Sequence, residues 1–95
     1  MSRLVVEIDP TPLKKNERVL FWKISYCIEA IVVEILPLSG AAATLSVAVP
    51  SEEDATWAKL TMDTPIRPDK SGAKGEADLF SAIKGAAKIK MVIIR

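Results

Sequence analysis

Histidine is absent from this 95-residue sequence, and cysteine occurs once, as Cys27. Imidazole is the commonest general base and a frequent metal ligand, while cysteine zinc sites need several thiolates. Nucleophile–histidine pairs, histidine-ligated metals, cysteine zinc sites and intrachain disulfides are therefore excluded. No glycine-rich run has the spacing of a nucleotide-binding P-loop. We therefore predict a non-enzymatic protein with no metal site and no cofactor.

Carboxylates are the remaining groups that could act without histidine. Glu52, Glu53 and Asp54 are consecutive, but they lack the central glycine and the oxygen spacing of a calcium loop. Asp63 and Asp69 flank a proline-containing segment and could pair as in glycoside hydrolysis, which also needs a cleft that holds a sugar. A short chain with 5% aromatic residues offers little room for such a cleft. An enzyme that works through carboxylates alone is the third hypothesis.

Positive charge is concentrated near the C-terminus. Residues 67–95 hold seven cations and three acids, a net charge of +4, whereas residues 1–66 hold six cations and nine acids, a net charge of −3. The candidate anion or nucleic-acid contacts are Lys84, Lys88 and Lys90. Nucleic-acid surfaces interleave cations with aromatic rings, and only Phe80 is close in sequence. We favour an edge strand whose lysines prevent aggregation, with nucleic-acid binding as the alternative.

A G-x-x-G run, Gly72–Gly75, resembles the loop by which some RNA-binding modules approach phosphates. Glu76 and Asp78 follow directly, and their charge opposes a phosphate. An ordinary surface loop is the better interpretation.

Three of the five aromatic residues lie within six positions, as Phe21, Trp22 and Tyr26. On one strand Trp22 and Tyr26 would share a face and Phe21 would take the other, so both faces would need cover from a core or from another subunit. Tryptophan and tyrosine also dominate binding hot spots. These three residues are the candidate interface.

Alternation of apolar and polar residues predicts strands over residues 3–8, 43–49 and 88–95. Residues 19–36 are harder to assign. Their apolar side chains hold even positions first and odd positions later, which predicts a strand with a bulge or tight turn near Glu29–Ala30. A buried helix over the same residues is the alternative.

Other segments carry signals for helices and loops. Ser51 with an acid three residues later has the form of a capping box and predicts a helix over 52–60, although a strand over 56–62 is an alternative. Residues 78–85 predict one or two helical turns. Residues 63–75, with their prolines and glycines, predict a loop.

Length and composition predict one folded domain over residues 1–95, with 49% hydrophobic and 26% charged residues. We expect a mainly β, sandwich-like domain with four to six strands and one or two short helices, or else an α+β domain. The N-terminus lacks a signal-peptide core, and charges interrupt the most apolar stretch. We therefore expect a soluble protein, cytoplasmic or inside a virion or other particle, that is not exported by a signal peptide.

The aliphatic excess in so short a chain favours a partner surface. We therefore predict a structural or interaction module that binds itself or another protein, without contact to a membrane. The uneven charge could also let copies meet head to tail in a ring or a stack.

Overall fold

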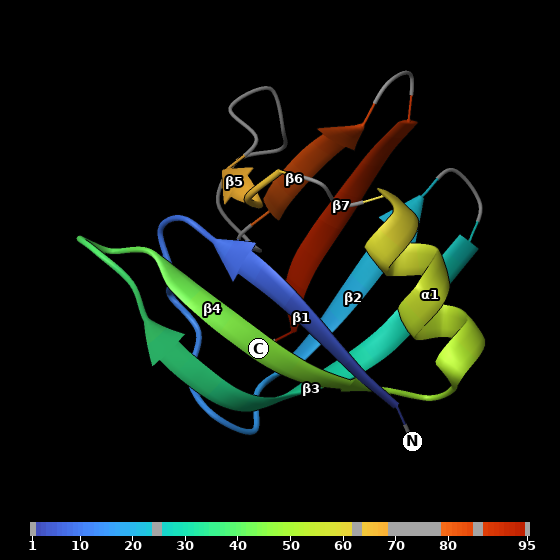
Figure 1. The fold of residues 1–95 in the computed structure, drawn as a ribbon, viewed down its shortest axis with the longest axis horizontal. Helices are drawn as coiled ribbons and strands as arrows, with labels where there is room; N and C mark the ends of the chain where they lie inside the picture. The colour runs from blue at the N-terminus through green and yellow to red at the C-terminus, as the bar shows by residue number, and fades with distance from the viewer. Residues whose placement is uncertain (1, 24–25, 62–63, 69–78, 85–86, 95) are drawn as a thin grey trace.

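The computed structural model describes residues 2–23, 26–61, 64–68, 79–84 and 87–94 (Figure 1). Within these residues, seven strands form one sheet in the order β1-β4-β3-β2-β7-β6-β5, with every neighbouring pair antiparallel. The elements are β1 (Ser2–Ile8), β2 (Arg18–Lys23), β3 (Tyr26–Pro37), β4 (Ala43–Val49), α1 (Glu52–Thr61), β5 (Arg67–Pro68), β6 (Leu79–Lys84) and β7 (Ala87–Ile94). The prediction of a mainly β fold is confirmed.

The two ends of this sheet meet at Ile8 and Ile66, which form a parallel bridge. The backbone N–H of Asp9 donates to the carbonyl oxygen of Ile66 at 2.9 Å, and the N–H of Ile66 donates to the carbonyl oxygen of Glu7 at 2.8 Å. The sheet thus curls around a single core (Figure 1), where we had expected a sandwich of two sheets. Alternation shows which side chains point inward, but one curled sheet and two facing sheets produce the same pattern.

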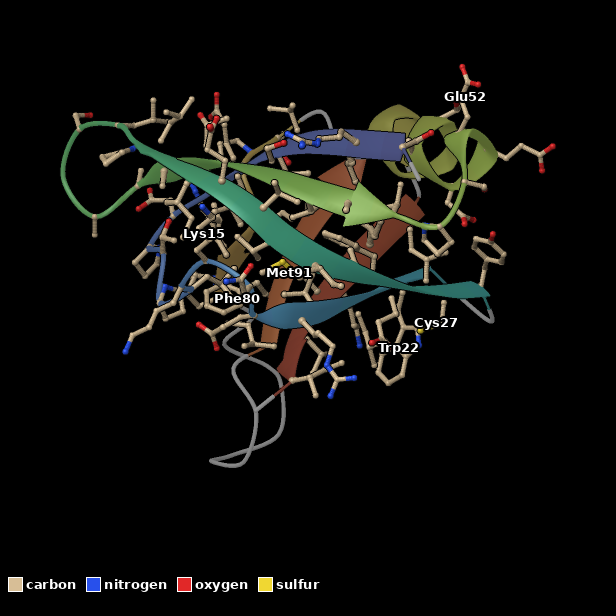
Figure 2. The ribbon with its side chains drawn as sticks, turned by 90° about the horizontal axis from the view of Figure 1, so that it is seen from below. Lys15, Trp22, Cys27, Glu52, Phe80 and Met91 are labelled. Atoms are coloured by element: carbon tan, nitrogen blue, oxygen red, sulfur yellow. The ribbon has the colours of Figure 1, made fainter. Side chains whose placement is uncertain are left out.

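The core consists of the inward-facing residues of β1, β2, β3, β4, β6 and β7 together with Leu13 and Ile66. Phe21 on β2 and Phe80 on β6 both lie opposite Met91 on β7, and all three are buried. Figure 2 shows Phe80 and Met91 in the interior, between the strands. The strands predicted near both termini and at 43–49 are confirmed, with the inward faces we expected.

The described part of segment 19–36 lies in strands β2 and β3, so the helical alternative is wrong. Their phase change, however, was placed wrongly. Glu29 and Ala30 pair regularly with β2, whereas the phase already changes from β2 to β3, because Lys23 pairs with Tyr26. Residues that pair directly across an antiparallel ladder share a face. In this register each odd residue of β2 pairs with an even residue of β3, as Phe21 does with Ile28. A second shift, between Val32 and Glu34, marks a bulge or irregularity in β3.

Helix α1 confirms the first interpretation of residues 52–60 over a strand. The Ser51 hydroxyl accepts a hydrogen bond from the N–H of Asp54 at 3.2 Å, as the capping box predicts. The helix packs mainly against β1, with lesser contacts to β4, β6 and β7. In Figure 1 it stands beside the end of the sheet where β2 is followed by β3.

Two local predictions are wrong. The helical turns expected over 78–85 are instead strand β6, in which Phe80 and Ala82 are buried. Pairing with β5 and β7 overrides the local helix signals, a tertiary effect that propensity does not contain. The loop expected over 63–75 includes buried Ile66 and strand β5, while its glycines lie outside the described residues.

The inward position of Phe21 and the outward position of Trp22 predict unequal costs of truncation. Phe21→Ala should lower the free energy of unfolding by about 3–5 kcal/mol, because it empties a fully buried site. Trp22→Ala should cost about 1 kcal/mol or less at low protein concentration. Chemical denaturation of both variants measures the difference, and equal costs would contradict the assigned faces.

Candidate interaction surface

The outer face of the three adjacent strands β3, β2 and β7 carries an unusual set of side chains. Strand neighbours of these residues, among them Val19, Phe21 and Met91, are buried, so the alternate positions project away from the core. We call this set the outer patch. Its members are Arg18, Leu20 and Trp22 of β2, Cys27, Glu29 and Ile31 of β3, and Lys90, Val92 and Ile94 of β7.

Apolar side chains dominate the outer patch. Trp22 is 42% exposed and Ile31 is 39% exposed, and the three other aliphatic members are partly exposed. The solvent-facing side of an antiparallel sheet is usually polar. Figure 2 shows Trp22 and Cys27 together on this outer side, away from the interior that holds Phe80 and Met91. The patch has the composition of a contact surface.

Charged residues border this apolar centre. Arg18 and Glu29 form an ion pair with 3.3 Å between Nη1 and Oε1. Exposed pairs of this kind contribute about 0–1 kcal/mol, so the ion pair adds little to stability. Lys90 lies directly opposite Trp22 in the β2–β7 register.

Cys27 lies opposite Trp22 on the other side of β2. Desolvation raises the pKa of the Cys27 thiol, the charge of Glu29 adds to this effect, and a hydrogen bond with the Trp22 side chain opposes it. A raised pKa keeps the thiol protonated at neutral pH. Since the thiolate is the reactive form, Cys27 is a poor nucleophile here.

Tyr26 does not share a face with Trp22, because Trp22 pairs with Cys27, the strand neighbour of Tyr26, and successive residues of a strand point to opposite faces. Its hydroxyl donates a hydrogen bond to Oδ1 of Asp54, a nearly buried residue in the first turn of α1. This bond raises the pKa of Tyr26, and desolvation and the charges of Asp54 and Glu53 raise it further. Tyr26 therefore links the start of β3 to the helix.

The other predicted interface residue, Phe21, lies in the core and not on the surface. Trp22 is the candidate that the structure leaves on the outer patch. Partners across strands could not be read from the sequence, because residues 22 and 90 are far apart in the chain.

The lysine interpretation needs a correction. β7 lies between β2 and β6, so Lys88 and Lys90 sit on the face of an inner strand and cannot protect a sheet edge. Lys84 is the last residue of β6 and pairs with Ala87. The structure describes its backbone and not its side chain. In the sheet, Trp22 is an aromatic neighbour of Lys90. The sequence could not show this, because the two residues are far apart in the chain.

The described residues provide no site for the metal-binding or catalytic carboxylates that the sequence suggested. Asp63 and Asp69 lie outside the described residues, and no metal-binding group of three histidine, cysteine, aspartate or glutamate residues occurs in the described part of the chain. One groove of about 360 Å³ is lined by Thr64, Pro65, Arg67, Ser81 and Ala82. Another of about 280 Å³ is lined by Arg3, Leu4, Val5, Ala55 and Thr56. Neither of these linings includes a carboxylate.

Comparison of the chain with protein-family models, with curated proteins and with solved structures finds no match. Among the described residues, the helical part is too short and too polar to span a bilayer. Function must therefore be argued from the surface itself.

The bond between Tyr26 and Asp54 predicts an altered tyrosine titration. Tyr26 is the sole tyrosine of the chain, so ultraviolet absorbance at alkaline pH follows this one group. Its pKa should lie above the usual value, and Asp54→Asn should lower it by removing the carboxylate charge. Stability from the bond is present below the unfolded-state pKa and is lost as pH rises through the raised pKa. Identical titrations of the two proteins would show that the bond does not form.

Proposed function

We propose that this protein is a non-enzymatic interaction module that self-associates through the outer patch. The observation that carries the proposal is the position of Trp22, 42% exposed on the middle one of three adjacent strands, with exposed or partly exposed aliphatic residues further along the same face. Burying apolar surface contributes about 25 cal/mol per Å², and association occurs where this gain exceeds the loss of translational, rotational and side-chain freedom. An exposed tryptophan on such a surface is a typical hot spot residue.

The geometry of the sheet supports one broad contact. Neighbouring strands lie about 4.8 Å apart and rise about 3.4 Å per residue, so the nine members of the outer patch form a continuous surface. A partner that covers it removes Trp22 and Ile31 from water together. Self-association is also the property that a component of a virion or another particle requires, and this role is part of the proposal.

Introduction of a negative charge at Trp22 tests the proposed function. Wild-type protein should show a mass in solution that rises with concentration in analytical ultracentrifugation. Trp22→Glu should stay monomeric over the same range, because a carboxylate buried in the contact would lose its hydration.

Val5→Glu is the matched control. Val5 is 65% exposed, more than Trp22, and lies on β1 outside the outer patch. It should associate like the wild type, and far-UV circular dichroism should show the same fold for all three proteins. A wild type that is monomeric at every concentration, or a Trp22→Glu variant that associates normally, would refute the proposal.

Binding of single-stranded nucleic acid is the second candidate, and the pairing of Trp22 with Lys90 favours it. An exposed indole beside cations can stack a base while the cations contact phosphates. Glu29 on the same face and a net charge of only +1 oppose it.

Fluorescence titration with a labelled single-stranded oligonucleotide at two salt concentrations tests this second candidate. Nucleic-acid binding predicts an affinity that falls with salt and is lost in Trp22→Ala and Lys90→Ala. Absence of salt-dependent binding would eliminate it, which is the result that the proposed self-association predicts.

A further inference from the structure

We infer that the groove beside β5 and β6 binds a phosphate group, which is held by Arg67, Ser81 and Lys90. The inference goes beyond the proposed self-association and does not depend on it. It follows from the strand register, which brings donors from three strands side by side, and from the groove that two of these residues line.

The three side chains lie level with one another on adjacent strands. Ser81 of β6 pairs directly with Arg67 of β5 on one side and with Lys90 of β7 on the other. Residues that pair directly across an antiparallel ladder have Cβ atoms about 4.5–5.5 Å apart. A serine hydroxyl therefore lies between two long cationic side chains, whose charged ends can both reach a ligand above it.

All three side chains point away from the core. The residues on either side of Ser81 are buried, and so are those on either side of Lys90. Arg67 follows buried Ile66 and is itself exposed. Because successive side chains of a strand alternate between faces, the hydroxyl and both cations share the outer face of the sheet.

The groove beside this row has a volume of about 360 Å³ and is lined by Thr64, Pro65, Arg67, Ser81 and Ala82. This volume falls within the range of roughly 300–1,000 Å³ that is usual for small-molecule sites. The polar side chains of the lining are two hydroxyls and one guanidinium, all of which can donate hydrogen bonds. A lining of donors without a carboxylate suits an anion.

These donors are not engaged within the described part of the chain. The side chains of Thr64, Arg67, Ser81 and Lys90 form no hydrogen bond or ion pair with other described residues. Glu29, an acid on the same face, lies on β3, two strands beyond β7, and is paired with Arg18. Both cations of the site can therefore turn towards a ligand without breaking a contact described here.

Phosphate fits this arrangement better than a carboxylate does. A phosphate monoester carries a charge of about −1.5 to −2 at pH 7 and three strong acceptor oxygens. It binds both the planar fork of arginine and the point charge of lysine. Because its oxygens point in tetrahedral directions, one phosphate can accept from side chains of three neighbouring strands. A carboxylate presents its oxygens in one plane, which suits the fork of Arg67 alone.

Titration with inorganic phosphate at constant ionic strength tests the site. In two-dimensional NMR the amide resonances should shift in a saturable way, with the largest shifts at Ser81 and its two strand partners. Arg67→Gln and Ser81→Ala should each raise the dissociation constant at least about tenfold, because each removes a hydrogen bond to a charged group.

Arg3→Gln is the matched control. Arg3 is also an exposed arginine that lines a groove, the one of about 280 Å³ between β1 and α1, so the substitution removes the same charge from another place. This variant should bind phosphate like the wild type. If circular dichroism shows that Arg67→Gln does not fold, Ser81→Ala provides the same test with a smaller change.

Two results would overturn the inference. One is a set of phosphate-induced shifts that do not saturate or that Arg67→Gln leaves unchanged, and the other is acetate binding at least as tight as phosphate binding. Inorganic phosphate and a small phosphomonoester should both bind, and the tighter of the two shows whether the ligand is the free ion or an ester.

The outcomes also separate this inference from the proposed function. A wild type that stays monomeric at every concentration and binds phosphate would refute self-association alone. A wild type that associates and shows no saturable phosphate binding would refute the phosphate site alone.

Discussion

The position of β2 between β3 and β7 is the constraint on which the rest of the structure depends. Successive side chains of a strand point to opposite faces, so burial of Phe21 against Met91 forces Trp22 outward. Pairing on both edges leaves β2 no freedom to twist its outer side chains away. The packing that stabilises the core thus also decides which side chains of β2 face outward.

Closure of the sheet depends on a much smaller contact. Two backbone hydrogen bonds join Ile66 to Glu7 and Asp9, while helix α1 packs against β1 and is linked to β3 through Tyr26 and Asp54. Because loop-closure entropy rises only slowly with loop length, a few bonds at this junction suffice to hold the ends of the sheet together. The outer patch lies on the strands farthest from the junction in sheet order, where pairing is continuous.

The sequence was most informative where apolar residues alternate without interruption. β1, β4 and β7 follow that rule, and their inward faces were predicted correctly because burial of one face leaves a period of two. β6 was mistaken for helix because Asp78 and Gly85 resemble helix caps, although the strand pairs on both sides. Propensity describes a segment by itself and does not contain the neighbours that decide its conformation.

The candidate surface was only partly predictable. Trp22 was one of three aromatic candidates and lies on the outer patch, but its neighbours Lys90 and Val92 come from a distant part of the chain. Phe21 looked equivalent to Trp22 in sequence, and the pairing of β2 with β7, which buries Phe21 opposite Met91, decides which of the two is inside. Long-range pairing is the information that a single sequence lacks.

The central claim is that Trp22 is exposed in a single copy and covered when copies associate. Acrylamide quenching of tryptophan fluorescence in a Trp57→Phe background, measured over a range of protein concentrations, reports on Trp22 alone. We predict that quenching is efficient in dilute protein and falls as concentration rises. Equal quenching at all concentrations would contradict the account.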